Sequence, residues 1–243
     1  MITTNAIHQM IDLEEFSHYG QGIYSTGAWD KVGIEILLRS KHGNPEQIFM
    51  EAKSVKRLFE LEIKSILKLL YTYIQVTTSR EKLFINLFPS TIMHPDFPLF
   101  MGKLVKKLPP DYKNKMIFEL IESEKVENIA LLKKRIKLLK DYGFQIAIDD
   151  IGKGWSSLSM IIEIQPEYIK LDRYFSNNLS KSSLKQEMIK SLLTYTQATN
   201  SKIILEGIEI NADLATAKYL GIPLCQGFLL DEPKPILHEW ILQ

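Results

Sequence analysis

The segment KMIFELIESEKVENIALLKKRIKLLKDYGFQIAIDD, residues 115–150, determines how we interpret the fold of the chain. Two apolar runs of strand length, 115–121 and 144–150, lie at its ends. Between them apolar residues recur at helical spacing from Ile129 to Leu139, and lysines cover much of the remaining surface. We interpret the lysine-rich side as a solvated outer face. The segment therefore predicts a strand, a helix and a second strand.

The same alternation extends along the whole chain. Strand candidates lie at 22–25, 32–38, 82–88, 115–121, 144–150, 167–171, 202–207 and 224–228. Helix candidates lie at 46–70, 97–107, 127–142, 155–164, 180–199 and 211–220. Strands that alternate with helices indicate an α/β protein with a mostly parallel sheet, and eight strands favour a closed (β/α)8 barrel. The first two strands are separated only by a turn, so we expect an antiparallel hairpin there.

Composition sets the broad class of protein. The chain has 243 residues, a formal net charge of +1 and a single cysteine, Cys225. This length fits one barrel domain over 1–243. The near-zero charge argues against a protein that coats polymeric nucleic acid, and one cysteine excludes an intramolecular disulfide. No signal peptide or membrane-spanning run is evident, so we expect a cytoplasmic protein.

Acidic and polar residues recur at the ends of these apolar runs. The set consists of Glu35, Asn86, Glu119, Asp149, Asp150, Lys170, Glu206 and Gln226. Carboxylates are rarely buried unless they are paired or bound to metal, and the carboxyl ends of parallel barrel strands meet at one mouth. Oxygen ligands favour Mg²⁺ or Mn²⁺ over zinc, and the five histidines show no ligand spacing. The sequence thus predicts an acidic metal site.

Two features of this set bear on chemistry. The neighbouring carboxylates of Asp149 and Asp150 could serve two cations, an arrangement suited to phosphoryl displacement. Lys170 has two interpretations. It either compensates the acidic charges as an ion pair, or it orients or deprotonates the attacking water.

The ordered motifs closely resemble those of the EAL family of cyclic di-GMP phosphodiesterases. These motifs are EILLR, NLFPS, ELIES, DDIGKGWSSL, YIKLD, EGIE and QGF, and the similarity runs from about residue 21 to residue 233. The resemblance implies a TIM-like barrel with an antiparallel first strand. It also implies hydrolysis of cyclic di-GMP to linear pGpG with Mg²⁺ or Mn²⁺, with two ions bound and Ca²⁺ inhibitory. A homodimer is an option that the sequence leaves open.

The resemblance also implies roles for individual residues. Metal ligands would be Glu35, Asn86, Glu119, Asp149, Asp150 and Glu206, with Glu35 and Lys170 serving catalysis. Lys170 would contact the catalytic water. Arg39 would hold a substrate phosphate, and Leu37 would pack near a guanine. Gln21 and Gln226 would be polar residues that contact substrate, and Glu122 would anchor the loop that follows the aspartate pair.

This chain departs from the usual family pattern at five positions. The replacements are Ile36 for alanine, Ile121 for threonine, Ile151 for phenylalanine, Lys153 for threonine and Gly22 for proline. None of them removes an implied metal ligand. The loop replacements bear on how the second metal is positioned.

Three functional hypotheses remain at this point. The leading one is an active phosphodiesterase, because every implied ligand and the lysine are present. The alternative is a catalytically weak or inactive receptor that binds cyclic di-GMP without hydrolysis. A protein-interaction module is disfavoured, because clustered carboxylates without a function would cost stability.

Overall fold

The computed structural model describes residues 2–74, 81–121, 124–152 and 157–236. Contacts divide the chain into two compact units. The first consists of Met1–Gly20, Ile36–Arg80 and Pro233–Gln243, and the second of Gln21–Glu35 and Glu81–Glu232. The expectation of a single domain over 1–243 stays a prediction.

The first unit is mainly helical. It contains α1 (Thr4–Asp12), α2 (Pro45–Ser54), α3 (Leu58–Ile74), the short strand β9 (Lys234–Pro235) and parts of β1 (Ser17–Ser25) and β2 (Lys31–Arg39). The single helix expected at 46–70 is two helices. Lys56 adopts a left-handed conformation with φ of 59°, which ends α2 before α3 begins. The helical period alone carries no signal for this break.

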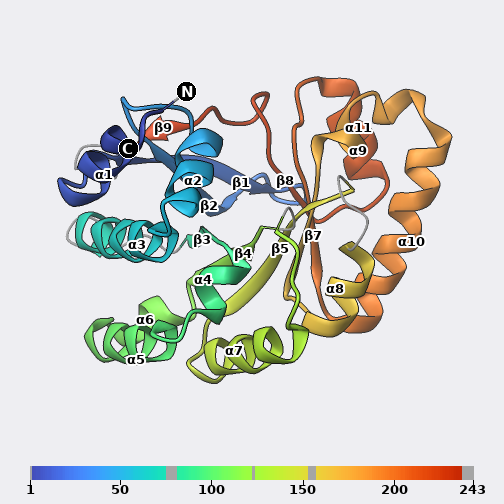
Figure 1. Ribbon diagram of the computed structural model, residues 1–243. Helices are drawn as coiled ribbons and strands as arrows, with labels where there is room; N and C mark the ends of the chain where they lie inside the picture. Colours follow the sequence, from blue (N-terminus) through green and yellow to red (C-terminus); the bar gives the residue numbers. More distant parts are fainter. Residues whose placement is uncertain (1, 75–80, 122–123, 153–156, 237–243) are drawn as a thin grey trace. The chain divides into compact units, whose positions relative to one another are not determined.

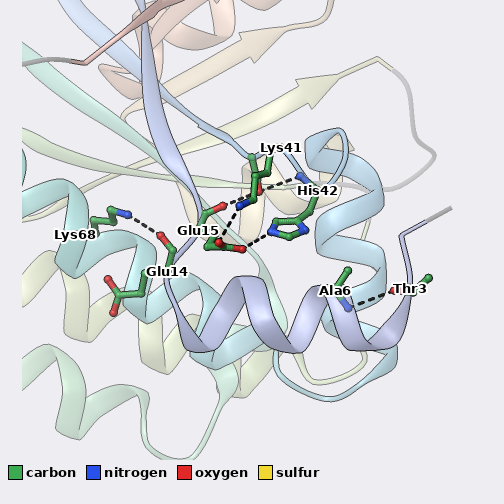
Figure 2. A network of polar contacts seen from close by, with 8 residues as sticks. Thr3, Ala6, Glu14, Glu15, Lys41, His42 and Lys68 are labelled. Atoms are coloured by element: carbon green, nitrogen blue, oxygen red, sulfur yellow. Dashed lines mark hydrogen bonds and ion pairs between the residues drawn. The ribbon is translucent and has the colours of Figure 1, made fainter.

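A polar network centred on Glu15 joins the end of α1 to the segment after β2 (Figure 2). The Glu15 carboxylate lies 2.8 Å from Lys41 Nζ and 2.6 Å from His42 Nε2. Ser40 donates a hydrogen bond to the Glu15 carbonyl, and Lys68 donates to the Glu14 carbonyl. The network thereby fixes the segment that follows Arg39.

The second unit is the α/β barrel. Its strands are the remaining parts of β1 and β2, with β3 (Lys82–Leu87), β4 (Met116–Leu120), β5 (Gln145–Ile151), β6 (Tyr168–Leu171), β7 (Lys202–Leu205) and β8 (Leu224–Cys225). The sheet order is β2-β3-β4-β5-β6-β7-β8-β1, and the pairing of β1 with β2 closes it. Strands β3 to β8 are parallel, whereas β1 is antiparallel to β8. The predicted barrel with an antiparallel first strand is confirmed.

Helices lie outside this sheet and connect its strands (Figure 1). They are α4 (Pro89–Met93), α5 (Phe97–Lys107), α6 (Pro110–Lys113), α7 (Ile129–Asp141), α8 (Ser157–Ile164), α9 (Arg173–Ser176), α10 (Ser183–Thr199) and α11 (Asn211–Tyr219), with the 3-10 turn η1 (Leu179–Lys181). The short α4, α6 and α9 were not expected from the sequence. Of the helices in the described residues, none is long and apolar enough to cross a bilayer.

The barrel interior begins with an apolar layer. It consists of Ile23, Phe84, Ile117, Ala147, Tyr168, Ile204 and Leu224, with Val32 packed against it. Gly33 belongs to this layer too, because a Cβ there would lie 2.6 Å from the Phe84 ring. At the rim below, Lys82 donates hydrogen bonds to Gln145 and Tyr168. Side chains two residues apart on a strand share a face. The residues two positions further along each strand therefore form the next interior layer.

Candidate functional site

The predicted polar residues form that next interior layer. On the parallel strands and β2, every one except Asp150 lies two residues beyond a residue of the first interior layer, as Glu119 does beyond Ile117 and Lys170 beyond Tyr168. On the antiparallel β1 the order is reversed, so Gln21 precedes Ile23 by two. Strand register then sets neighbours side by side, with Asn86 paired to Glu119 across β3 and β4. The structure brings together Gln21, Glu35, Asn86, Glu119, Asp149, Asp150, Lys170, Glu206 and Gln226.

Lys170 lies at the centre of the acidic groups. Its Nζ atom is fully buried, and four carboxylates from four different strands or strand ends surround it. The distances from Nζ are 2.7 Å to Glu206, 2.9 Å to Glu119, 3.0 Å to Asp149 and 3.4 Å to Glu35. One ammonium therefore contacts carboxylates from β2, β4, β5 and the end of β7.

Burial dominates the electrostatics of this cluster. It raises the pKa of Glu119 well above the ordinary carboxyl value, with the nearby Lys170 charge acting in the opposite direction. The pKa of Glu206 is raised for the same reason. Burial alone would lower the pKa of Lys170, but the charges of Asp149 and the neighbouring glutamates outweigh it and raise the pKa well above its usual value. Lys170 therefore remains an ammonium in this arrangement.

A backbone irregularity places Asp149 and Asp150 at one site. The β5–β6 register shifts between Ile148 and Ile151, and Asp150 has a φ of 57° in the left-handed region. Adjacent residues on a regular strand face opposite sides, whereas a bulge changes the direction of one of them. An unusual backbone conformation at a non-glycine residue is a feature of functional sites.

The carboxylates form two groups suited to metal binding. Glu35, Glu119 and Asp149 have ligand oxygens within 4.8 Å of one another, and so have Asp149, Asp150 and Glu206. Asp149 is common to both groups. Both Glu119 oxygens and Asp149 Oδ1 are buried, and the Lys170 ammonium contacts Glu119 Oε1 and Asp149 Oδ1. Five carboxylates and one ammonium carry a formal charge of minus four, which two divalent cations would neutralise. The donor set therefore fits two such ions.

A pair of glutamines borders Glu35. Gln226 Nε2 donates to Glu35 Oε2 at 2.5 Å and lies 3.0 Å from Gln21 Oε1. Gln21 Nε2 donates to the Asp231 carbonyl at 2.9 Å. Gln21 and Glu35 belong to β1 and β2, and Gln226 directly follows β8. The contact joins segments far apart in the chain, which explains why the sequence does not reveal it.

A cavity of about 240 Å³ opens beside the acidic cluster. Glu35, Asp150, Glu206 and Gln226 line it, together with residues that we did not single out as site residues from the sequence: Arg173, Gly207, Glu209, Gly227 and Phe228. Glu209 and Phe228 lie within the EGIE and QGF motifs, so motif membership could have indicated them. Arg173 and Glu209 lie 3.4 Å apart, and both side chains are exposed. The cavity lining therefore combines carboxylates with an arginine, an amide and an aromatic ring.

Gly22, Ile151 and Gly152 lie in closely packed surroundings. A Cβ at Gly22 would lie 2.6 Å from the Tyr24 ring, so that ring takes the space a side chain would need. Ile151 is buried and belongs to β5. A Cβ at Gly152 would lie 2.5 Å from the Phe175 ring, and its φ of 116° also favours glycine.

Three predicted residues are not part of this cluster as described. Arg39 and Leu37 belong to the first unit, where the Arg39 guanidinium lies 5.7 Å from the centre of the Tyr19 ring and donates to the Leu38 carbonyl. Across the described part of the chain, no carboxylate pairs with Arg39. Glu122 lies outside the described residues, as does Lys153.

Among curated proteins, the chain is similar to two that are named as cyclic di-GMP phosphodiesterases. The chain is 27% identical over 240 residues to the cyclic di-GMP phosphodiesterase PdeF of Escherichia coli, covering 96% of this chain and 32% of PdeF. It is 30% identical over 152 residues to the cyclic di-GMP phosphodiesterase PdeA of Borreliella burgdorferi, covering 63% of this chain and 22% of that protein. The chain thus spans about a third or less of these relatives.

Solved structures agree with this fold. A manganese and cyclic di-GMP complex of Klebsiella pneumoniae BlrP1 superposes with a TM-score of 0.82 and 26% identity, over 91% of this chain and 57% of BlrP1. An EAL domain protein of Listeria monocytogenes superposes with a TM-score of 0.81 over 97% of this chain and 95% of that protein; at 21% identity this likeness concerns the fold alone. The family model for the EAL domain matches residues 4–233, so the chain belongs to the EAL domain family.

Proposed function

We propose that this chain binds cyclic di-GMP and hydrolyses one of its phosphodiester bonds with the help of Mg²⁺ or Mn²⁺. Water would add to phosphorus, the bond from phosphorus to the 3′ oxygen would break, and the product would be linear pGpG. The observation that carries the proposal is the pair of carboxylate groups that share Asp149 around a buried lysine. The relatives named above as cyclic di-GMP phosphodiesterases support the choice of substrate.

The carboxylates would hold the cations. Glu35, Glu119 and Asp149 form one candidate group with Asn86 beside it, and Asp149, Asp150 and Glu206 form the other. Two bound divalent cations would supply a more acidic water and stabilise negative charge on the phosphoryl oxygens. The raised pKa values of Glu119 and Glu206 fit this assignment, because both groups need a compensating positive charge.

Lys170 would hold the carboxylates in a common arrangement and act at the reacting phosphate. An ammonium that contacts four carboxylates keeps their oxygens convergent before substrate arrives. Its raised pKa favours the charge-compensating interpretation over a general base. The group would therefore orient the attacking water by donating hydrogen bonds, not remove a proton from it.

Substrate contacts would come from the cavity and from Arg39. Gln226 lines the cavity of about 240 Å³ beside the acidic cluster. An arginine with no carboxylate partner among the described residues is suited to a phosphate, because its planar guanidinium can donate two parallel hydrogen bonds. We retain Leu37 as a residue that packs near a guanine and Glu122 as the anchor of the loop after Asp150.

The experiment that tests this proposal combines the purified chain, cyclic di-GMP and Mn²⁺, with separation of products by chromatography. Formation of pGpG that stops on addition of EDTA is the expected result. Binding of cyclic di-GMP without turnover would favour the receptor function instead. If the chain neither binds nor hydrolyses cyclic di-GMP, both functions are contradicted.

Two further expectations belong to the proposal. A homodimer is supported by exposed apolar side chains on α8 and α10, among them Leu158, Ile162 and Leu184. Light scattering at micromolar concentration would distinguish a dimer from a monomer. The cytoplasmic location stays a prediction.

A further inference from the structure

We infer that Gln21 is a positioning residue, which fixes the amide of Gln226 and through it the metal-binding carboxylate of Glu35. This inference rests on the proposed function, because it concerns how the chain prepares its metal site. It differs from the role expected from the motifs, in which Gln21 contacts substrate.

The first step is the geometry of the contact. Gln21 is 7% exposed and Gln226 is 4% exposed, so both amides are withdrawn from bulk water. Gln226 Nε2 lies 3.0 Å from Gln21 Oε1 and 2.5 Å from Glu35 Oε2. Both neighbours of this nitrogen are acceptors, which satisfies its two hydrogens and determines which end of the amide points at Glu35.

The second step concerns the hydrogen bonds that the Gln21 amide makes. Its oxygen accepts from Gln226, and its nitrogen donates to the Asp231 carbonyl at 2.9 Å. The Asp231 backbone is in turn held by a hydrogen bond from its nitrogen to the Gly227 carbonyl. Gln21 is therefore anchored at one end by main chain and presents a fixed acceptor at the other.

The third step concerns the backbone of Gln226. Its nitrogen donates to the Leu205 carbonyl, and its carbonyl accepts from the Ile208 nitrogen. The backbone is thus fixed, and the remaining freedom of Gln226 lies in its side chain. Rotation of the terminal amide would turn its carbonyl oxygen toward both Gln21 Oε1 and the Glu35 carboxylate, where acceptors repel one another. Gln21 adds a second acceptor to the one at Glu35 and so strengthens the preference for the observed orientation.

The fourth step connects the amide pair to the metal site. Glu35 Oε2 is held by Gln226, while Glu35 Oε1 faces Asn86 Nδ2 at 3.4 Å and Lys170 Nζ at 3.4 Å. The two oxygens therefore have separate functions, and the carboxylate plane is set by the contact with Gln226. Groups that orient a metal ligand typically change metal affinity by about 10- to 100-fold when they are removed.

The amide pair also leaves one acceptor in the site. Gln226 Oε1 is buried and has no hydrogen-bond donor among the described residues. It belongs to a residue that lines the cavity beside the acidic cluster. With the nitrogen committed to Gln21 and Glu35, this oxygen is left to accept a hydrogen from a bound water or a substrate N–H or O–H group. Gln21 thereby determines that Gln226 presents its oxygen, a hydrogen-bond acceptor, to the site and not its N–H donors.

The test measures Mn²⁺ binding without substrate. Gln21→Met keeps the length of the side chain and removes both hydrogen-bonding groups. We expect it to weaken Mn²⁺ binding by about 10-fold, measured by titration calorimetry or from the electron paramagnetic resonance signal of free Mn²⁺. In a Gln226→Leu background the same change should have no further effect, because Gln21 acts through Gln226.

A matched control is available on α10. Gln186 Nε2 donates to the Leu179 carbonyl at 2.9 Å, as Gln21 does to Asp231, but Gln186 lies outside the acidic cluster. Gln186→Met should leave Mn²⁺ binding unchanged. If Gln21→Met does not fold, as judged by circular dichroism, Gln21→Asn replaces it. The shorter amide keeps the site polar but withdraws from Gln226, so it too should weaken Mn²⁺ binding.

The outcomes separate this inference from the proposed function. Unchanged Mn²⁺ affinity in Gln21→Met, with weaker binding of cyclic di-GMP in both backgrounds, would show a direct substrate contact and overturn the inference. In that case the proposed function would stand. Failure of the unmodified chain to bind Mn²⁺ at all would instead overturn the proposed function, and the positioning role with it.

Discussion

Tyr168 and Lys170 lie two residues apart on β6, and they belong to two successive layers of the barrel interior. The Tyr168 ring packs among apolar side chains, in edge-to-face contact with Phe84 at 5.1 Å. Lys170 lies one layer higher and contacts four carboxylates. The apolar layer closes the site from below, and this exclusion of water strengthens every charge interaction above it.

Replacement of Lys170 by methionine should make the protein depend on metal for its stability. The side chain keeps a similar volume, but the carboxylates lose their internal cation. Removing one partner of a buried ion pair typically costs about 3–5 kcal/mol. We expect thermal unfolding in EDTA at a much lower temperature, and partial recovery when Mn²⁺ is added.

The same variant should lose turnover far more than substrate affinity. Loss of a group that orients the reacting water typically lowers the rate by about 10²–10⁴-fold. Binding of cyclic di-GMP can be measured with Ca²⁺ present, where we expect little hydrolysis. The control is Lys82→Met at the opposite rim of the interior, which should leave turnover intact. Weakened binding with normal turnover at saturation would instead make Lys170 a substrate clamp.

Stability of the metal-free protein should fall as pH rises above the ordinary carboxyl range. The folded-state pKa values of Glu119 and Glu206 are raised, so the folded chain binds protons that the unfolded chain has released. Their contribution is fully present below the unfolded pKa of about 4.3 and is lost as pH rises through the raised folded values. Added Mg²⁺ should therefore raise the unfolding temperature more at pH 8 than at pH 6.

A comparison with Glu119→Gln isolates this effect from other titrating groups. His18 has a pKa lowered to about 4 by burial, and it contributes stability above about pH 6.5 that is lost toward pH 4. Its effect has the opposite sign. The Glu119→Gln variant should show a smaller decrease in stability between pH 6 and pH 8 in EDTA. An identical slope in both proteins would contradict the raised pKa of Glu119.

Metal identity should matter through coordination. Mg²⁺ and Mn²⁺ should support hydrolysis, EDTA should abolish it, and Ca²⁺ should bind but support it poorly. The physical reason is that Ca²⁺ takes longer and looser coordination, which displaces the reacting groups. Product formation with each ion at matched saturation checks this. Full turnover in EDTA would show that no metal is needed.

Glu35→Ala and Arg39→Ala should affect different steps. Glu35 belongs to a metal-binding group, so its removal should abolish turnover in a protein that remains folded. Arg39→Ala should chiefly weaken binding of cyclic di-GMP, because a charged hydrogen bond contributes about 1.5–3 kcal/mol. Turnover at saturating substrate and binding in Ca²⁺ separate the two. Normal turnover in Glu35→Ala would remove that residue from the metal site.

The positions of the site residues could be predicted because strand periodicity carries them. Glu119 lies between Phe118 and Leu120 on β4. Successive side chains on a strand face opposite sides, so Glu119 faces the barrel interior while its two neighbours face the helices. Phe118 faces outward and contacts Phe144 edge to face, with the ring centres 5.3 Å apart. A carboxylate in so apolar a run is a strong signal. Asn86, Lys170 and Glu206 could be located in the sequence because they lie in or at the ends of apolar runs.

Other features carried no local signal. The left-handed backbone of Asp150 depends on the shifted pairing of β5 with β6, which is a relation between distant segments. The contact between Gln21 and Gln226 spans 205 positions of the chain. Strand β1 begins at Ser17, five residues before the predicted start, because its first half is stabilised by pairing and not by apolar alternation. Long-range pairing therefore limits what the sequence alone can predict.

Gly33→Ala should damage the site through the apolar layer beneath it. A Cβ at Gly33 would lie 2.6 Å from the Phe84 ring and 3.3 Å from the Lys82 carbonyl, so the ring has to shift. Overpacking of this kind typically costs about 1–3 kcal/mol. Because Glu35 follows two residues later on the same strand, we also expect weaker Mn²⁺ binding.

The matched control for this prediction is Gly102→Ala on α5. A Cβ there would meet only the Tyr142 hydroxyl at 3.7 Å, an ordinary contact. Alanine is favoured over glycine within a helix by about 1 kcal/mol, so this variant should be more stable. Chemical denaturation measures both changes, and titration with Mn²⁺ measures the effect on the site. If Gly33→Ala is as stable as the unmodified protein, Phe84 does not fill the space above Gly33, and the layered arrangement beneath Glu35 is wrong.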